Sequence, residues 1–269
     1  MTTVFETFKP KNPVIAKYVD YYYIDSKPDN IKTEFTCFPH YNNVISLYRA
    51  HTRMPDGTMV FDKTVKPLQM FTPIRENVMQ VRQLGELHRI VIVFNPLGVE
   101  QFYRCNFSGY ITDYDFFTAS EMQSLFETED TTVLTDLLDK YLTERHIPFE
   151  NTILTRSISY IFKHYEDFSI EAMAQELQTS RRHLVRVFKA HFGVSLKKFQ
   201  QIVLFRKVME HKLFANNNKS FTALAHEYNF SDQAHLNKVF EKLTQHSPKQ
   251  FFNKGTLLGE QDTFWHFEK

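Results

Sequence analysis

Two stretches of the chain repeat one another at a nearly constant spacing, and this repeat constrains the fold more than any other feature. The segment HLVRVFKAHFGVSL from His183 aligns with HLNKVFEKLTQHSP from His235 at an offset of 52 residues. Upstream, EAMAQEL from Glu171 aligns with TALAHEY from Thr222 at an offset of 51, so the second copy has one additional residue in its turn. Both copies have apolar residues at helical spacing on either side of a short polar turn. The repeat therefore predicts two helix-turn-helix units.

Helix-capping residues support this placement of the helices. Ser169 is predicted to cap a helix that ends near Leu177, and Ser180 to cap the helix that follows. A serine side chain at this position accepts a hydrogen bond from a free backbone N–H of the first turn. In the second copy the turn is NFSD, in which Asn229 suits a positive φ and Ser231 is the predicted cap.

The second helix of each unit is predicted to have one buried face and one outward face. With Ser180 as the cap of the first, Leu184, Val187 and Phe188 share the face that packs on the preceding helix. The outward residues are Arg182, Val185, Arg186 and Lys189 in the first copy and Gln233, Ala234, Asn237 and Lys238 in the second, with His235 at the edge. In a helix-turn-helix this face lies in the DNA major groove, where Arg pairs with guanine, Gln with adenine, and Lys neutralises phosphate. For His183 and His235, a role in the turn is an equal alternative.

The segment between the two copies is predicted to be one long helix. SLKKFQQIVLFRKVMEHKLF contains neither Gly nor Pro and has apolar residues at helical spacing. A helix of about 18 residues is roughly 27 Å long. It can hold two recognition helices about one DNA turn apart, ~34 Å, so that both reach successive major grooves.

Charge is unevenly distributed along the chain, although the net charge is only +1. Residues 156–255 contain 16 basic residues (Lys and Arg), 8 acidic residues (Asp and Glu) and seven histidines. Residues 1–155 contain 15 basic and 20 acidic residues. A basic segment joined to an acidic one is typical of a module that binds a polyanion. Double-stranded DNA is the polyanion that a repeated helix-turn-helix binds.

On these residues, positions 157–252 resemble the DNA-binding domain of AraC-type transcription regulators, in which a central helix joins two helix-turn-helix units. The resemblance is carried by IEAMAQELQTSRRHLVRVFKAHFGVS and ALAHEYNFSDQAHLNKVFEKLTQHSPKQFF. It implies that base-contacting positions fall on Arg182, Val185 and Arg186, and on Gln233, His235 and Lys238. The residues expected at the DNA interface are Ser180, Arg181, Arg182, Val185, Arg186, Lys189, Ser231, Gln233, His235, Asn237, Lys238 and Lys242.

Several positions depart from the family pattern. Asn229 and Gln245 stand where glycines are usual, Leu196 where a proline is usual, Phe252 where a basic residue is usual, and Glu241 where lysine is common. We therefore expect the second unit to contribute less to DNA binding than the first.

The first 150 residues are predicted to be β-rich. NNVISLY, TMVFD, VMQVRQL and HRIVIVF are short, rich in strand-forming residues and separated by polar turns. After them VLTDLLDKYLTERH predicts an amphipathic helix with Val133, Leu134, Leu137, Leu138, Tyr141 and Leu142 on one face. RHIPFEN is a plausible linker. The fold class expected is a two-domain α+β protein, with an N-terminal β-rich domain (1–150), an all-α DNA-binding domain (151–255) and a C-terminal tail (256–269).

By its position before the DNA-binding repeat, the N-terminal region resembles the cupin-like, jelly-roll sensory domains that precede AraC-type domains. The resemblance implies a small-molecule effector or dimerisation, but it names no ligand. The helix around Leu134, Leu138 and Tyr141 is a candidate homodimer seam, and packing on its own barrel is an equal alternative. The tyrosine-rich YVDYYYID could line a ligand cavity, although packing in the core is the favoured interpretation.

Catalytic alternatives are weakly supported by the sequence. His40, His51 and His88 lack the spacing of a metal cupin, so neither a metal nor another cofactor is expected. Cys37, close to His40, raises the alternative of a repair enzyme that accepts methyl groups, but it is more consistent with a small apolar strand residue. Cys37 and Cys105 fit a reducing cytoplasm, with a single bridge between them left open.

The sequence thus predicts a cytoplasmic, non-enzymatic transcription regulator that binds specific double-stranded DNA. It begins without a signal peptide and has no apolar stretch as long as the ~18 residues of a membrane span. An effector, a homodimer partner and RNA polymerase are the other partners considered. The alternatives are a factor controlled by its abundance or by a protein partner, and the same DNA reader fused to an enzymatic or repair domain.

Overall fold

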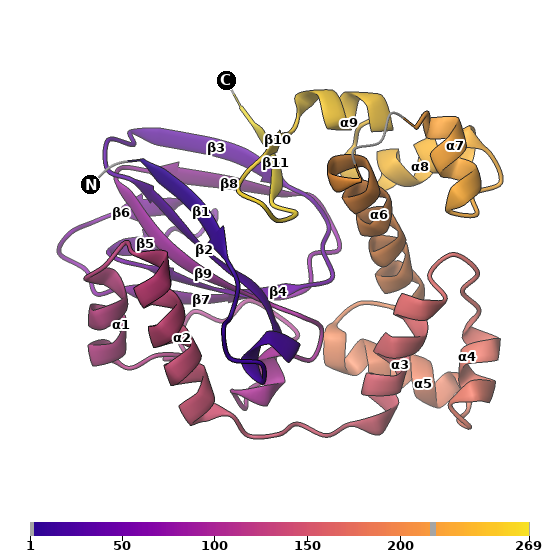
Figure 1. Ribbon diagram of the computed structural model, residues 1–269, viewed down its shortest axis with the longest axis horizontal. Helices are drawn as coiled ribbons and strands as arrows, with labels where there is room; N and C mark the ends of the chain where they lie inside the picture. The colour runs from indigo at the N-terminus through magenta and orange to yellow at the C-terminus, as the bar shows by residue number, and fades with distance from the viewer. Residues whose placement is uncertain (1–2, 216–218, 269) are drawn as a thin grey trace.

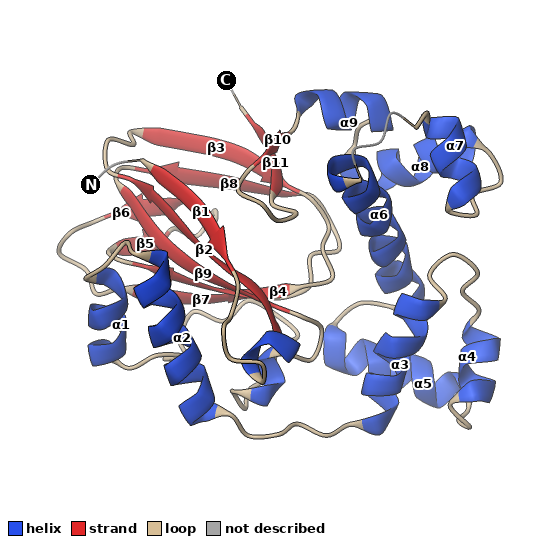
Figure 2. Cartoon of the chain, viewed as in Figure 1, coloured by secondary structure: helices blue, strands red, loops and turns tan. Residues whose placement is uncertain are grey.

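The computed structural model describes residues 3–215 and 219–268. A β-rich N-terminal part precedes an α-helical C-terminal part, as Figure 2 shows by colour. The predicted two-part α+β architecture is therefore confirmed.

Two sheets form the framework of the N-terminal part. One sheet has the strand order β1-β2-β9-β4-β7 and the other the order β10-β11-β3-β8-β6-β5. The strands, in chain order, are β1 (Val4–Phe8), β2 (Val19–Lys27), β3 (Lys32–Cys37), β4 (Asn43–Tyr48), β5 (His51–Arg53), β6 (Met59–Phe61), β7 (Leu68–Thr72), β8 (Met79–Leu84), β9 (Leu87–Phe94), β10 (Thr256–Leu257) and β11 (Phe264–Phe267). Two 3₁₀ helices, η1 (Ile15–Lys17) and η2 (Val99–Gln101), flank the first sheet.

The four segments predicted as strands are all strands. They correspond to β4, β6, β8 and β9. All eight residues of β9 are buried, because this strand lies in the middle of its sheet between β2 and β4 and is covered on both faces. A continuous apolar run such as HRIVIVF is the pattern expected of a strand buried on both sides.

The tyrosines of β2 divide between the two faces of the sheet. Tyr22 is fully buried in the main apolar cluster, and its hydroxyl donates a 2.8 Å hydrogen bond to Asp139 of the helix above. Tyr21 and Tyr23, on the other face, line an internal cavity. Since successive side chains of a strand alternate in direction, the tyrosines pack on both faces of the sheet, and Tyr21 and Tyr23 are buried in a second apolar cluster. The favoured interpretation of YVDYYYID, packing in the core, is therefore confirmed.

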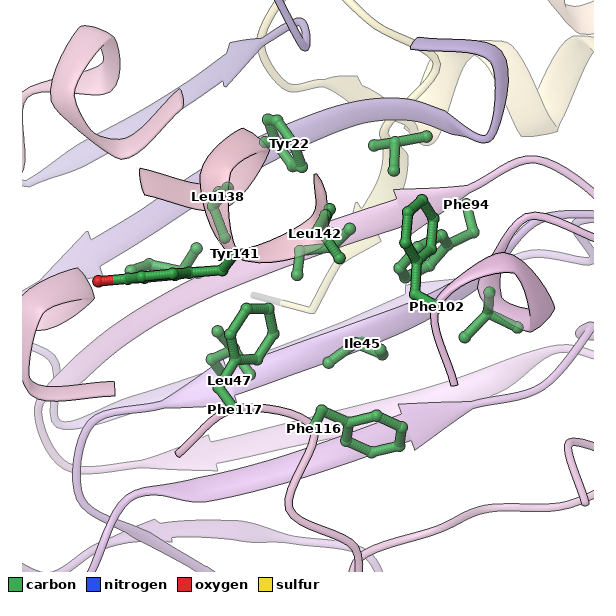
Figure 3. Packing of buried hydrophobic residues seen from close by; sticks show 14 of the residues in the cluster. Tyr22, Ile45, Leu47, Phe94, Phe102, Phe116, Phe117, Leu138, Tyr141 and Leu142 are labelled. Atoms are coloured by element: carbon green, nitrogen blue, oxygen red, sulfur yellow. The ribbon is translucent and has the colours of Figure 1, made fainter. Parts of the chain in front are cut away.

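Helices α1 (Ala119–Phe126) and α2 (Thr131–Arg145) cover the five-stranded sheet. The apolar face of α2 packs on its own sheet, because Leu134, Leu138 and Leu142 are fully buried in one cluster with Tyr22 and Leu47. Figure 3 shows Leu138 and Leu142 in this cluster. These residues cannot form the dimer seam considered above, because the protomer itself covers them. Val133, predicted on the same face, is instead 43% exposed.

The C-terminal part consists of short helices arranged around one long helix. They are α3 (Thr152–Lys163), α4 (Ile170–Glu176), α5 (Arg181–Phe192), α6 (Leu196–Phe214), α7 (Phe221–Glu227), α8 (Gln233–Thr244) and α9 (Pro248–Lys254). Helices α4 and α7 begin 51 residues apart, and α5 and α8 begin 52 residues apart, so the repeat in the sequence is a repeat in the fold. In Figure 1, α6 runs from the unit of α4 and α5 to the unit of α7 and α8.

The segment after α9 returns to the N-terminal part. Strands β10 and β11 form a hairpin, and β11 pairs with β3 through His266 opposite Thr36 and Phe267 opposite Phe35 (Figure 1). This pairing extends the second sheet with residues that follow the DNA-binding repeat in sequence. The end of the chain therefore connects the two parts a second time.

The two parts also share their apolar cores. Ile74 and Leu97 of the N-terminal part pack in the cluster beneath α5, and Phe38 packs in the cluster beneath α8. Phe38 meets Phe251 of α9 edge to face at 4.7 Å between ring centroids. The helix-turn-helix units therefore rest directly against the β-rich part.

Candidate nucleic-acid interface

The first helix-turn-helix unit forms as the capping residues predict. The hydroxyl of Ser169 accepts a hydrogen bond from the backbone N–H of Ala172 at the start of α4, and that of Ser180 accepts one from His183 at the start of α5. Leu184 and Phe188 are fully buried against the neighbouring helices. Helix α5 is thus fixed by its apolar face and by its N-terminal cap.

The outward face of α5 is strongly basic. Arg182, Arg186 and Lys189 are exposed, and Val185 is partly exposed between them. A shallow groove along this face is lined by Arg181, Arg182, Val185, Arg186, Lys189 and Ala190. Because no acidic residue lines this groove, its potential favours a polyanion.

Two of these arginines have partners on the protein surface. Arg181 forms an exposed 2.7 Å ion pair with Glu171 of α4, and Arg186 Nη2 lies 3.1 Å from His183 Nδ1. Exposed ion pairs contribute little to stability, so both guanidiniums can exchange these partners for DNA at small cost.

The second unit has the same arrangement, but the residue that caps its recognition helix differs from the one predicted. The cap of α8 is Asp232, whose carboxylate accepts a 2.7 Å hydrogen bond from the N–H of His235, so the prediction of Ser231 was wrong. The additional turn residue moves the helix start by one position, and aspartate caps as well as serine does. Ser231 instead lies 3.4 Å from the His235 ring nitrogen.

The outward face of α8 is less basic than that of α5. Gln233, His235 and Lys238 are exposed, and Asn237 is partly exposed. Gln233 accepts a 2.6 Å hydrogen bond from Thr222 of α7. Lys242 is also exposed, one turn beyond Lys238. The predicted residues of both recognition helices are thus exposed or partly exposed.

Two departures from the family pattern, Asn229 and Gln245, have a positive φ, as the equivalent residues of the first unit do. Gln245 ends α8 with φ of 64°, as Gly193 ends α5 with φ of 74°, and these two residues are 52 positions apart. Gln178 and Asn229, 51 apart, both have positive φ in the two turns, as predicted for Asn229. Asparagine tolerates this conformation, whereas glutamine is strained in it, so Gln178 and Gln245 each adopt it at a local cost.

Phe252 stands where a basic residue is usual in the family, and its side chain packs against other aromatic rings. Its ring stacks on Phe221 of α7 at 6.1 Å between centroids and contacts Phe240 of α8 and Phe264 of β11. This aromatic cluster joins the second unit to the C-terminal hairpin.

Helix α6 has 19 residues, close to the length predicted, and is capped by Ser195. One of its residues was overlooked in the sequence: Arg206 is only 5% exposed and donates hydrogen bonds to the carbonyls of Pro39 and Phe38, at 2.7 and 3.1 Å. Its Nη1 lies 3.5 Å from a carboxylate oxygen of Asp262. An arginine within the apolar pattern of a central helix is the signal that could have identified it.

The structure also describes the cysteines and histidines of the β-rich part. Cys37 is a buried strand residue of β3, as favoured from the sequence, and burial raises the pKa of its thiol, which makes it a poor nucleophile. Both cysteines are free. Within residues 3–215 and 219–268, no three His, Cys, Asp or Glu side chains cluster so as to hold a metal ion.

His40 is held neutral by its surroundings. Burial, and then the Arg206 charge, lower the pKa of His40 to about 4. Its Nδ1 accepts a hydrogen bond from the N–H of Asn42, so Nε2 carries the proton and donates to Asp262 at 2.8 Å. Burial alone would raise the pKa of Asp262, but His40 and Arg206 more than offset it and hold that pKa well below its usual range.

Comparison with known proteins agrees with this geometry. The sequence model of a family described as "Helix-turn-helix domain" matches residues 173–254. An uncharacterised HTH-type transcriptional regulator from Haemophilus influenzae is 28% identical over 122 residues, and one from the cgkA 5′ region of Pseudoalteromonas carrageenovora is 28% identical over 106. These matches cover 44% and 39% of this chain, and the chain spans 40% and 61% of the lengths of these two relatives.

Similarity of fold extends beyond the matched domain. The structure of ToxT from Vibrio cholerae aligns with a TM-score of 0.50 at 10% identity, over 94% of this chain and 98% of ToxT. The arrangement of a β-rich part followed by two helix-turn-helix units is thus shared with a solved protein. Among the described helices, none is long and apolar enough to cross a membrane.

Proposed function

Because residues 173–254 form a helix-turn-helix domain of the AraC type, we propose that this protein is a transcription regulator that binds specific double-stranded DNA. The observation that carries the proposal is the pair of accessible recognition helices, α5 and α8, at opposite ends of the single helix α6 (Figure 1). A spacer of 19 residues, about 28 Å long, suits two major grooves one turn apart.

The residues of α5 divide into base readers and phosphate contacts. Arg182 and Arg186 are four residues apart on the exposed face, and each can donate two hydrogen bonds to guanine. Val185 between them can contact a thymine methyl group. Lys189 is one turn farther along and suits the phosphate backbone, as does Arg181 at the helix start.

Helix α8 offers a second set of DNA contacts, which we expect to be weaker than those of α5. Gln233 suits adenine, Asn237 and His235 can reach base edges, and Lys238 and Lys242 suit phosphates. We propose that Ser180, the cap of α5, and Ser231, just before the cap of α8, contact phosphates from the two turns, since helix N-termini favour anions. With its smaller positive charge, α8 is the secondary reading helix.

Selection of bound sequences from a random DNA pool tests this proposal directly. We expect an enriched site with two conserved elements about one helical turn, ~10 base pairs, apart. The site should then bind at least about a thousandfold more tightly than random DNA at physiological salt. Recovery of no enriched sequence would contradict the proposal.

We further propose that the β-rich part controls this binding, through a ligand or through self-association, in the cytoplasm. The support is the direct packing of Phe38, Ile74 and Leu97 into the cores of the two units. A change in the β-rich part therefore reaches α5 and α8 without crossing a flexible linker. A homodimer would use a surface other than the buried face of α2, and RNA polymerase is the natural partner if the protein activates transcription.

A further inference from the structure

The segment that follows the helix-turn-helix repeat, residues 256–268, packs on the β-rich part, and we call it the C-terminal strap. One end of the strap contacts strand β1. There the backbone N–H of Glu260 donates a 3.0 Å hydrogen bond to Thr7 Oγ1, and the backbone of Gly259 lies against the same side chain. The other end pairs with β3 as strand β11. The strap therefore joins the second helix-turn-helix unit to two different strands.

Asp262 lies in the middle of the strap, and its carboxylate has partners from three separate elements. It accepts hydrogen bonds from His40 Nε2 at 2.8 Å and from the Tyr21 hydroxyl at 3.3 Å. Arg206 Nη1 lies 3.5 Å from the carboxylate and also donates to the Asp262 backbone carbonyl at 3.4 Å. These partners belong to the β3–β4 connection, to β2 and to helix α6. One side chain of the strap thus contacts both parts of the molecule.

Arg206 lies near the middle of α6, the helix that separates the two recognition helices. Its buried guanidinium attaches α6 to the β-rich part by donating to the carbonyls of Phe38 and Pro39. A buried cation is tolerated inside a fold when an anion offsets its lost hydration. Asp262 supplies that charge, so the strap is part of the attachment of α6.

The strap also contacts the second helix-turn-helix unit directly. His266 Nε2 donates a 2.9 Å hydrogen bond to the carbonyl of Phe251 in α9. The Phe264 ring packs on Phe251 and Phe252, at 5.1 and 6.0 Å between centroids. Phe251 is fully buried and meets Phe240 of α8 edge to face. A movement of the strap therefore moves the surface on which α8 rests.

The first unit is attached to the β-rich part through other residues. Ile74 and Leu97 pack in the cluster beneath α5, and Tyr41 meets Phe162 of α3 edge to face at 5.0 Å between centroids. The described residues of this cluster include none from the strap. The two recognition helices thus have separate attachments, and the strap belongs to that of α8.

We propose that Asp262 is a positioning residue for DNA binding, which holds α6 and the second unit, through Arg206, in the orientation that lets α5 and α8 reach their DNA elements together. This inference rests on the proposed function. Without the Asp262 charge, Arg206 regains water only if α6 moves away from Pro39. Base contacts need donor–acceptor distances of about 2.7–3.2 Å, so a small rotation of α8 loses them. The length of α6 then sets the distance between the recognition helices, and Asp262 sets their relative orientation.

Three DNA duplexes derived from the selected site separate orientation from stability. The first carries both elements, the second has the α8 element scrambled, and the third has one additional base pair between the elements. The affinity of the full-length protein for each duplex is measured by fluorescence anisotropy. The parent protein should bind the first duplex most tightly. The ratio of its affinities for the first and second duplexes then measures the contribution of α8.

Asp262→Asn keeps the shape of the side chain and removes its charge. We expect it to reduce this ratio about tenfold, which is the order of one good base contact, and to leave the affinity for the scrambled duplex within about twofold of the parent. Discrimination against the third duplex should also decrease, because the second unit is no longer held in one orientation. The matched control is Glu260→Gln, which removes the same charge from an exposed position of the strap and should bind all three duplexes like the parent.

A milder variant carries the test if Asp262→Asn does not fold. The Tyr21 hydroxyl contacts the strap at Asp262 and, at 3.0 Å, at Thr263 Oγ1. Tyr21→Phe removes these contacts without leaving a buried charge unpaired. We expect it to reduce the ratio about threefold, as for the loss of one hydrogen bond, with the scrambled duplex again bound like the parent.

Four results would overturn the proposal. An unchanged ratio in the variants means that Asp262 does not position α8, and an equal loss of affinity on all three duplexes means that it serves stability alone. A gain of affinity for the first duplex means that the strap restrains α8 from DNA. A selected site with a single element leaves α8 nothing to reach.

These results are separate from a failure of the regulator proposal. A parent protein that selects no sequence contradicts the regulator itself. A parent that prefers the two-element duplex, with variants that keep its full ratio, rejects the role of Asp262 and leaves the regulator proposal standing.

Discussion

His191, in the last turn of α5, lies 2.7 Å from Glu100 of the β-rich part, measured between Nε2 and Oε1. The Glu100 side chain is 6% exposed and the His191 side chain 23% exposed, and Phe149 of the connecting segment stacks on the His191 ring at 5.6 Å. The C-terminal end of the first recognition helix is therefore attached to the β-rich part, while its N-terminal end is free to meet DNA.

Removing this contact should loosen the end of α5. We expect Glu100→Ala to increase amide hydrogen exchange about fivefold in residues 189–192 and 146–149, because a net loss of about 1 kcal/mol favours local opening. Hydrogen exchange followed by mass spectrometry measures this. Glu144→Ala, an exposed acid of α2, is the control, and equal exchange in both variants would show that the contact carries no restraint.

The two ends of the basic face should behave differently on DNA. Arg186→Ala should weaken binding to the selected site by ~1–3 kcal/mol and relax preference at one or two base pairs, whereas Lys189→Ala should weaken all sequences about equally. Gln233→Ala should relax preference about ten base pairs away, with a smaller effect. Fluorescence anisotropy on specific and random DNA measures all three. If Arg186→Ala weakens both DNAs by the same factor, α5 does not read bases.

Salt dependence should reveal the electrostatic part of binding. With about 6–8 phosphate contacts, log K should fall against log salt with a slope of roughly −5 to −7. Lys238→Gln should make this slope less steep by about one. Lys140→Gln, at an exposed position of α2 outside the interface, should leave the slope unchanged. A flat salt response would be incompatible with the interface described above.

The strained end of α8 predicts a stabilising substitution. Gln245→Gly should raise the free energy of unfolding by about 1 kcal/mol, because glycine adopts a left-handed conformation without a Cβ clash. Gly193→Ala, at the equivalent position of α5, should destabilise, since φ there is 74° and the added Cβ would lie 3.2 Å from the Ser108 carbonyl oxygen. Urea unfolding compares the two; a loss of stability in Gln245→Gly would contradict this account of the turn.

Stability should fall as the solution is acidified. Burial lowers the pKa of His40, His51 and His266 to about 4 each, against about 6.5 in the unfolded chain. The unfolded state therefore binds more protons between pH 6.5 and 4, so stability is full above pH 6.5 and is lost as the pH falls through this window.

His40→Gln isolates one of these contributions. It should reduce the slope of unfolding free energy against pH near pH 5 by up to about 1.4 kcal/mol per pH unit. Urea unfolding at pH 7 and pH 5, followed by Trp265 emission, measures it. An unchanged slope would mean that His40 is not held neutral by burial beside Arg206.

The helices of the DNA-binding part could be predicted from sequence because their signals are local. Caps at Ser169, Ser180 and Ser195 and apolar residues three and four positions apart define each helix within a few neighbours. The repeat at offsets of 51 and 52 residues then shows which helices of the two units are equivalent. The error at Ser231 arose because Ser and Asp both cap well, and only the length of the turn distinguishes them.

The sequence by itself determined two helix-turn-helix units on one spacer, a β-rich part before them and a basic face on α5. Only the tertiary structure decided that the strand Phe264–Phe267 completes the second sheet, that Arg206 spans from α6 to Pro39, and that Arg206 meets Asp262 inside the fold. These relationships join residues more than a hundred positions apart, or depend on which charges meet inside the fold. Periodicity and capping report only on neighbours in sequence, whereas pairing between distant strands and the burial of a charge depend on how complete elements pack together.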